Sequence, residues 1–257
     1  MSSANDVVPD PGVPCWVNLM VDDLQAAEAF YGAVLGWEFR PGSLGEGFST
    51  AFCKGRPVAG IGSRRPGLAP KPIWTPVFGV ADANAAAGSI RERGATVAVG
   101  PAALGTGRAA LAADREGATF GIWEGPTQVW PHGEDVGVRL DLQAWDLFEA
   151  AVFYGGVFGW ARGGPTGVEV SFRDDRVVAE HAGHTAATLR GGADPASSAL
   201  QERPRWLVTF EVEDMERAMG AAASGGGSRS ARPAALTGFA RTLRDPAGCL
   251  FNIAPAA

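Results

Sequence analysis

The sequence contains no long apolar run, no basic run and no pair of closely spaced cysteines. No stretch approaches the roughly 18 apolar residues of a membrane-spanning helix, so no transmembrane segment is expected. A formal net charge of −6 without a Lys/Arg cluster argues against a nucleic-acid partner. Cys15, Cys53 and Cys249 form no CxxC pair and are predicted to be buried small hydrophobic residues. Residues 1–12 have no basic-then-apolar signal pattern, which predicts a short flexible N-terminus and a cytoplasmic protein.

Charged residues are also scarce, whereas glycine and proline are abundant. The charged fraction is 19%, against roughly 25% in typical domains, and the chain holds 36 Gly and 18 Pro. This composition favours short strands joined by tight turns. The chain has no Gly-x-Ser-x-Gly nucleophile motif, and Gly60-Ile61-Gly62 is not followed by the helix start that a phosphate-binding loop needs. With 257 residues, 46% of them hydrophobic, the chain is long enough for two cores.

One eight-residue stretch occurs twice. Phe30–Trp37 returns as Phe153–Trp160, shifted by 123 residues with six of eight residues identical. Asp-Leu precedes both copies, at Asp23 and Asp146. A repeat of this kind indicates a tandem duplication of a unit somewhat over 100 residues long.

Each half of the chain divides again, into two quarters with the order strand, helix and three strands. The helices are expected to begin at capping aspartates, because a carboxylate can accept the free N–H groups of a first turn. The caps are Asp22-Asp23, Asp82, Asp146 and Asp214; the predicted strands are 15–21, 37–39, 48–53, 57–61, 74–80, 96–99, 108–112, 119–123, 138–142, 160, 168–172, 177–181, 206–212, 240–243 and 250–253.

Two segments break this order. Residues 125–136 differ sharply in composition from both flanks and are predicted to be a linker between domains 13–124 and 137–257. Residues 182–201 are polar and glycine-rich, which predicts a long mobile loop.

The helix motif Asp-Leu-x-x-Ala-x-x-Phe-Tyr-Gly-x-x-x-Gly-Trp, with Asp-x-x-Gly before the last strand at Asp114 and Asp245, resembles the vicinal oxygen chelate superfamily. This is the glyoxalase, bleomycin-resistance and extradiol-dioxygenase group, and within it the chain is most similar to two-domain bacterial proteins. The resemblance covers about residues 14–254. It implies an α+β fold of two tandem domains, each built from two βαβββ modules that form a cup-shaped mixed sheet around a ligand.

The resemblance also implies where a metal would bind, and the residues at those positions are poor ligands. The aligned positions are Trp16, Thr75, Arg139 and Leu207 on first strands, and Gly121 and Asn252 on last strands. An indole offers no lone pair and a guanidinium is itself a cation. No cofactor is therefore expected. The alternative is a divalent metal bound by Glu180 and His181. His184 follows three residues later, and Asp141 on the neighbouring strand could be a further ligand.

Several strand residues are candidates for ligand binding. Trp16 replaces a metal ligand, and Asn18 shares its face of the strand because side chains alternate. Arg139 and Asp141 occupy the matching pair in the third quarter and are expected to form an ion pair, either as a ligand anchor or as a purely structural contact. The other candidates, for which core packing is the alternative, are Trp74, Trp123 and Trp206; Trp37 and Trp160 are assigned to the core.

The residues favour binding over catalysis. The expected function is metal-independent binding of a small hydrophobic or aromatic molecule, and the resemblance implies antibiotic or aromatic-polyketide sequestration, or a helper role beside a tailoring enzyme. One alternative is an enzyme: a metal-dependent isomerase, lyase or dioxygenase using Glu180 and His181, or metal-free acid–base chemistry by Asp141 with Arg139. Another is a scaffold with filled cups. Because two fused domains already supply the module pairing, a monomer is expected.

Overall fold

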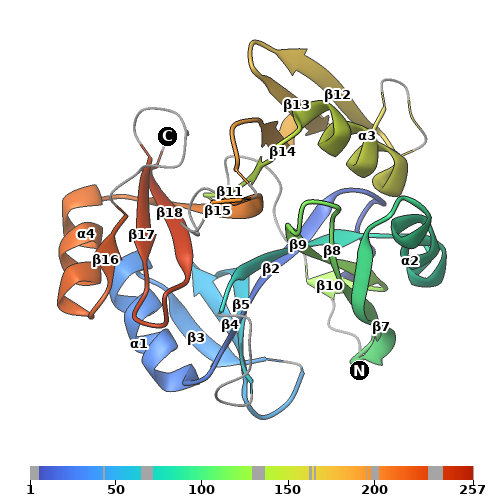
Figure 1. Ribbon diagram of the computed structural model, residues 1–257. Helices are drawn as coiled ribbons and strands as arrows, with labels where there is room; N and C mark the ends of the chain where they lie inside the picture. The colour runs from blue at the N-terminus through green and yellow to red at the C-terminus, as the bar shows by residue number, and fades with distance from the viewer. Residues whose placement is uncertain are drawn as a thin grey trace. The chain divides into compact units, whose positions relative to one another are not determined.

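The computed structural model describes residues 6–42, 44–64, 72–128, 137–161, 164, 166–194, 196–197, 203–230 and 240–256. Within them the fold is α+β, as predicted (Figure 1). The helices are α1 (Leu24–Leu35), α2 (Ala83–Glu92), α3 (Leu147–Phe158) and α4 (Met215–Ser224). The strands are β1 (Asp6–Val7), β2 (Pro14–Val21), β3 (Glu38–Pro41), β4 (Phe48–Cys53), β5 (Arg56–Ser63), β6 (Trp74–Gly79), β7 (Thr96–Leu104), β8 (Gly107–Ala113), β9 (Thr119–Glu124), β10 (Thr127–Gln128), β11 (Val138–Gln143), β12 (Val168–Arg173), β13 (Arg176–His181), β14 (His184–Arg190), β15 (Arg205–Val212), β16 (Ser228–Arg229), β17 (Arg241–Arg244) and β18 (Leu250–Pro255). No helix in these ranges is long and apolar enough to span a membrane.

The four helices begin where the sequence predicted. Asp23, Asp82, Asp146 and Asp214 each stand at the N-cap in an extended conformation, and each carboxylate accepts a backbone N–H of the first turn. The two repeated helices also end alike, because Gly36 and Gly159 take the left-handed conformation with φ of 71° and 70°.

Each quarter of the sequence forms a four-stranded βαβββ module. The strand orders are β3-β4-β5-β2, β6-β9-β8-β7, β12-β13-β14-β11 and β15-β18-β17-β16. Within every module the first strand pairs in parallel with the last, at one end of the module's strand order, and the remaining pairs are antiparallel. The two modules of each sequence half are joined in the strand order of one eight-stranded mixed sheet.

The compact units of the structure combine the modules differently from the sequence halves. Unit 1 comprises residues 1–16, 75–133 and 140–206, and unit 2 comprises residues 17–74, 134–139 and 207–257. In unit 1 helix α2 packs against α3, and in unit 2 helix α1 packs against α4 (Figure 1). The strand order joins the first quarter with the second and the third with the fourth, whereas the helices pair the second quarter with the third and the first with the fourth. The division into domains 13–124 and 137–257 stays a prediction.

The repeated Phe-Tyr…Trp motif builds an aromatic core in each unit. Tyr31 and Trp37 belong to the core of unit 2, and Tyr154 and Trp160 belong to that of unit 1. Trp37 and Trp160 are 8% and 5% exposed, which confirms their assignment to the core. Neither lies in a strand, so the strand predicted at Trp160 is wrong. The other rings are Phe30, Trp74, Phe210 and Phe251 in unit 2, and Phe78, Phe120, Phe153, Phe158 and Trp206 in unit 1.

The prediction of a mobile loop over residues 182–201 is wrong for its first part. His184–Arg190 forms β14, which pairs antiparallel with β13. Ala182 and Gly183, with φ of 49° and 82°, make the two-residue turn between these strands. Positive φ at both central residues is the geometry that suits a tight hairpin. Residue 195 and residues 198–201 lie outside the described residues.

The N-terminal segment 6–12 is held in unit 1, which corrects the prediction of a flexible lead. Strand β1 pairs with β10, and the Gly12 N–H donates to the carbonyl of Gly79 at 2.8 Å. The Gly12 carbonyl accepts the indole N–H of Trp160 at 2.7 Å. Backbone hydrogen bonds therefore order a segment that its composition predicted to be flexible. Residues 1–5, and residues 129–136 of the predicted linker, lie outside the described residues.

All three cysteines are free. Cys15 and Cys249 are buried, as predicted, and Cys53 is partly exposed. Burial raises the pKa of the Cys15 thiol to about 12. A thiol with so high a pKa is protonated at neutral pH and does not act as a nucleophile.

Candidate functional site

In unit 2 three buried polar side chains are hydrogen-bonded in series. This triad links β6, α1 and the turn before β18. The Trp74 indole N–H donates to the Tyr31 hydroxyl at 3.1 Å, and that hydroxyl donates to Oδ2 of Asp245 at 2.9 Å. The other oxygen of Asp245 accepts the backbone N–H of Cys249 at 2.7 Å. Burial raises the pKa of the Tyr31 hydroxyl well above its usual value and also raises the pKa of Asp245. The arrangement fixes the Asp-x-x-Gly turn to the repeated helix.

Unit 1 contains the same arrangement. The Trp206 indole N–H donates to the Tyr154 hydroxyl at 2.9 Å, and Tyr154 donates to Oδ2 of Asp114 at 2.9 Å. Trp74 and Trp206 were candidates for ligand binding on sequence grounds. Each is buried, and its single N–H is already used by a tyrosine. A ligand role for either indole remains a prediction, and it would have to use the ring alone.

The chain has only two tyrosines, and both belong to these triads. We predict that neither ionises in the folded protein near pH 10, where free tyrosine does, because burial and the neighbouring aspartate raise both pKa values. The unfolded chain releases its tyrosine protons first, so stability is lost as pH rises above about 10. An alkaline titration should show tyrosinate absorbance only together with loss of near-ultraviolet circular dichroism. Tyrosinate in a folded protein would contradict the prediction.

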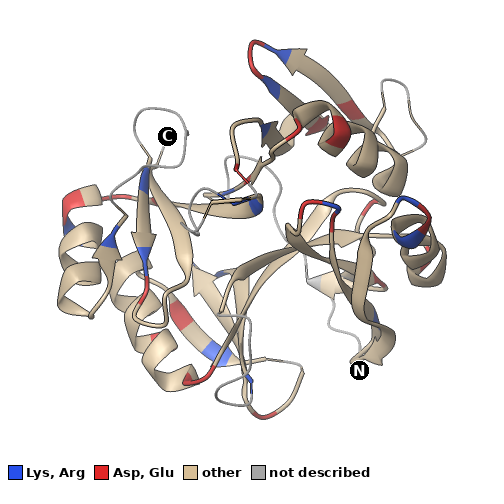
Figure 2. Cartoon of the chain, viewed as in Figure 1, with Lys and Arg blue, Asp and Glu red and all other residues tan. Residues whose placement is uncertain are grey.

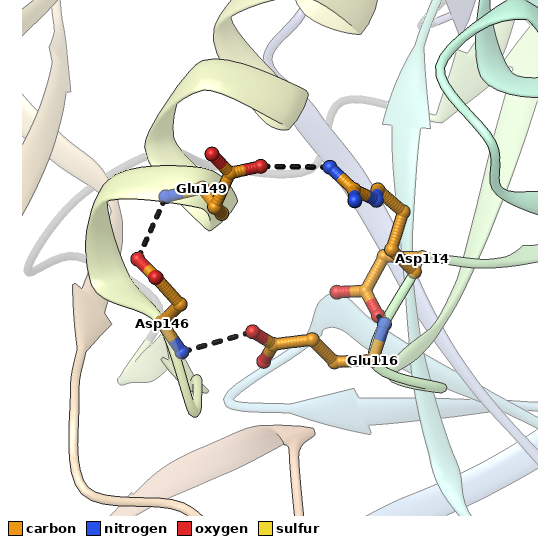
Figure 3. Close-up of polar contacts among 5 residues, drawn as sticks. Asp114, Glu116, Asp146 and Glu149 are labelled. Atoms are coloured by element: carbon orange, nitrogen blue, oxygen red, sulfur yellow. Dashed lines mark hydrogen bonds and ion pairs between the residues drawn. The ribbon is translucent and has the colours of Figure 1, made fainter.

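In unit 1 the Asp114 turn also holds the N-terminus of α3 (Figure 3). The Glu116 carboxylate accepts the backbone N–H groups of Trp145 and Asp146, at 2.7 and 2.9 Å. Arg115 forms an ion pair of 2.7 Å with Glu149 in the first turn of the helix. The corresponding turn of unit 2 has Pro246 and Ala247 in place of these two charged residues. The contacts that Arg115 and Glu116 make with the N-terminus of α3 therefore occur in only one of the two copies.

Trp16 and Asn18 lie on one face of β2, as the alternation of side chains predicted. Trp16 is partly exposed. Asn18 stands opposite Gly60 of β5, and its buried Oδ1 has no hydrogen-bond partner among the described residues. The face therefore offers an indole ring and a free acceptor oxygen.

Trp123, on β9, was a further candidate. Its indole N–H donates to the backbone carbonyls of Gly125 and Pro126, at 3.0 and 3.3 Å. The side chain is partly exposed. The indole N–H is therefore used by the turn after β9, whereas part of the ring is accessible to a ligand.

The predicted ion pair between Arg139 and Asp141 is not formed. The guanidinium Nε of Arg139 lies 3.9 Å from Oε1 of Glu211, and Asp141 lies 3.6 Å from Nε of Arg190. The two residues share a face of β11, as expected, but each pairs with a charged residue from another strand. Asp141 stands opposite Thr188 of β14, which brings Arg190, two residues further, within reach.

Sequence reasoning missed a row of polar residues in the third module. Arg176 stands opposite Arg190 in the β13–β14 pair, and Arg190 stands opposite Gln143 in the β14–β11 pair. Arg173 stands opposite Arg176 and extends the row to β12, where the hairpin tip carries both signs of charge (Figure 2). The alternation in residues 185–190 could have indicated β14, and with it the position of Arg190.

The alternative metal residues, Glu180 and His181, are engaged elsewhere in unit 1. Glu180 pairs with Arg173 at 2.7 Å, and Nε2 of His181 lies 3.3 Å from a carboxylate oxygen of Asp10. His184 stands opposite His181 across the hairpin. The described residues contain no group of three or more His, Cys, Asp or Glu side chains arranged to hold a metal.

The positions where the resemblance places metal ligands do not fit a metal either. Asn252, whose amide oxygen would be the best donor among them, is fully buried. Its Oδ1 accepts the Thr242 hydroxyl at 2.8 Å and its amide donates to Thr209 at 3.3 Å. Arg139 is a cation, and Gly121 has no side chain. This donor set provides no metal centre through which a reaction step could pass.

Comparison with known proteins gives relatives along nearly the whole chain. Residues 15–45 match the model of the bleomycin resistance protein-like N-terminal family, and residues 138–254 match that of the glyoxalase-like domain. The chain is 30% identical to CFP32 of Mycobacterium tuberculosis (strain CDC 1551 / Oshkosh), which has glyoxylase in its name, over 94% of each chain. It is 30% identical to the anthracycline biosynthesis protein DauV of Streptomyces sp. (strain C5), over 95% of this chain and 93% of that protein.

Among solved structures, the fold is similar to that of the 2,3-dioxygenase LapB from Pseudomonas sp. KL28. The TM-score is 0.59 at 14% identity, over 97% of this chain and 93% of LapB. At this identity the similarity concerns the fold alone. Together with the sequence relatives and the repeated βαβββ modules, it shows that the chain belongs to the vicinal oxygen chelate superfamily, with glyoxalase-like and bleomycin-resistance-like regions.

Proposed function

We propose that this protein binds a small hydrophobic, aromatic molecule without a metal ion. The observation that carries the proposal is the β2 face, where a partly exposed Trp16 replaces the family's first metal ligand beside the Asn18 oxygen, which has no hydrogen-bond partner in the described ranges. An indole ring can stack on a flat ligand. A buried acceptor without a partner suits a ligand hydroxyl, because a buried polar atom left unpaired is unfavourable.

The relatives support a role in the metabolism of aromatic natural products. Two of them, DauV and DnrV of Streptomyces peucetius, are named anthracycline biosynthesis proteins. By this proposal the protein sequesters an antibiotic or aromatic polyketide, or assists a tailoring enzyme that modifies one. The same proposal describes a cytoplasmic monomer with no metal cofactor and no nucleic-acid or membrane partner.

The test is native mass spectrometry and calorimetry with 1,4-dihydroxyanthraquinone, a flat hydroxylated aromatic probe. The wild-type protein should show no bound metal and should gain one or two probe molecules. Trp16→Ala should weaken binding by about tenfold or more, because it removes a central aromatic contact. Trp145→Ala is the matched control, since Trp145 precedes the N-cap of α3, is 64% exposed and should not affect affinity.

Two results would contradict the proposal. If Trp16→Ala leaves affinity within about twofold of wild type, the assignment of the β2 face is wrong, since loss of one central contact costs far more. If the purified protein carries a stoichiometric divalent metal, the alternative class is favoured: an isomerase, lyase or dioxygenase whose activity is lost on chelation and restored by one metal.

A further inference from the structure

Three neighbouring strands of unit 1 place two arginines and a glutamine side by side on one face of the sheet. Arg176 (β13) stands opposite Arg190 (β14), which stands opposite Gln143 (β11). Adjacent strands lie about 4.8 Å apart, so the three Cα atoms span about 10 Å. The alternate residues Leu142 and Leu189 are buried on the other face. The polar face is thus distinct from the side of the sheet that forms the core.

Each of these three residues has a buried polar atom without a hydrogen-bond partner among the described residues. The atoms are Nε of Arg176, Nε of Arg190 and Oε1 of Gln143. Such atoms are rare in folded proteins, because a buried donor or acceptor has lost its hydrogen bonds to water. Here two donors and one acceptor occur in adjacent positions of one row. Together they could bind a ligand that supplies both an acceptor and a donor.

The carboxylates that pair with Arg190 and Arg176 differ in burial. Asp141 lies 3.6 Å from Nε of Arg190, and its side chain is 13% exposed. Arg176 is paired only loosely with Asp174, at 3.7 Å, and the Asp174 side chain is 84% exposed, so solvent screens that pair. Two partly buried guanidiniums therefore share this face with one partly buried carboxylate, because the second carboxylate, Asp174, is exposed. A second anion on this face would complete the pairing.

The fold does not require these polar residues, as the first module shows. At the same places in its strand register it has Phe48, Gly62 and Met20. A Cβ at Gly62 would lie 2.8 Å from the Met20 sulfur and 2.9 Å from the Phe48 ring. At these three positions unit 2 thus has two apolar side chains around a glycine. The two copies differ in chemistry at the same positions of a shared strand register.

We propose that the face formed by Arg176, Arg190 and Gln143 binds the carboxylate of an aromatic acid and a hydroxyl on the same ligand. The planar guanidinium fork matches a carboxylate, and hydrogen bonds between such ions are stronger than neutral ones. The Gln143 oxygen accepts the ligand hydroxyl. This inference rests on the proposed function, which supplies the aromatic ring of the ligand, and it adds that a hydroxylated aromatic acid binds more tightly than its neutral counterpart.

Calorimetry with a matched pair of probes tests the inference. The pair is 1,4-dihydroxyanthraquinone-2-carboxylic acid and its methyl ester, which differ in charge but keep the ring system. The wild-type protein should bind the acid at least about tenfold more tightly than the ester. Arg176→Gln should weaken binding of the acid by about tenfold to a hundredfold and leave binding of the ester unchanged.

Arg173→Gln is the matched control. Arg173 belongs to the same row, but it is more exposed and already paired with Glu180. Its loss should change affinity for the acid by less than about twofold, as for surface ion pairs generally. Arg176 is preferred to Arg190 for the test, because Arg190 also pairs with the partly buried Asp141 and its removal would disturb that carboxylate. Arg176→Lys, which keeps the charge but not the fork, should retain part of the preference for the acid.

The outcomes separate this inference from the proposed function. If acid and ester bind equally, or if Arg176→Gln keeps the full preference for the acid, the arginine face is not the anion site, while aromatic binding stands. If 1,4-dihydroxyanthraquinone and both probes fail to bind, the proposed function and this inference are both overturned.

Discussion

Replacing Tyr31 by Phe is expected to lower the free energy of unfolding by about 2–4 kcal/mol. The variant keeps the ring but removes the hydroxyl that joins Trp74 to Asp245. The indole N–H and the carboxylate oxygen are then both left unpaired in the core, and each unpaired buried group costs about 1–3 kcal/mol. Urea unfolding followed by tryptophan fluorescence measures the loss.

The duplicated sequence allows the same substitution to be made in unit 1, and an exposed hydroxyl provides the control. Tyr154→Phe removes the same bridge between Trp206 and Asp114 in unit 1, and it should cost a similar amount. Ser224→Ala removes an exposed hydroxyl at the end of α4 and should stay within about 0.5 kcal/mol of wild type. If Tyr31→Phe is as mild as Ser224→Ala, the hydroxyl does not hold the turn to the helix.

The sequence identified the repeated elements of the fold because their signals are local. The capping aspartates, the closing glycines and the aromatic residues of the helix motif lie within a few residues of the turns and faces they form. The partners of the tyrosines could not be found in this way. Tyr31 and Asp245 are 214 residues apart, and their contact depends on the first module packing with the fourth. The packing of α1 against α4 cannot be predicted from the sequence of either helix alone.

The polar row was missed for a different reason. Residues 182–201 are polar and glycine-rich as a whole, so β14 resembled the start of a loop. Without β14 the sequence contained no strand on which to place Arg190. The face of Asp141 was predicted correctly from the alternation along β11. Its partner depended on the register between β11 and β14, which the sequence of either strand does not specify.

The N-terminal segment was misjudged because its order depends on backbone groups. Replacing Gly12 by Ala tests this point and is expected to destabilise the protein by about 3–5 kcal/mol. Gly12 has φ of +82°, a conformation that costs other residues about 1–2 kcal/mol. A Cβ at this position would also lie 2.5 Å from the backbone carbonyl oxygen of Phe158. Because that oxygen belongs to α3, relief requires the segment to move away.

Moving the segment would break the hydrogen bonds of Gly12 with Gly79 and Trp160, each worth about 1 kcal/mol. Gly183→Ala is the matched control, since Gly183 has the same φ of +82° but no atom within 4 Å of an added Cβ. It should show the conformational cost alone, about 1–2 kcal/mol. Urea unfolding of both variants separates strain from displacement. Equal losses would mean that residues 6–12 contribute little to unit 1, whereas an excess for Gly12→Ala measures what their attachment contributes.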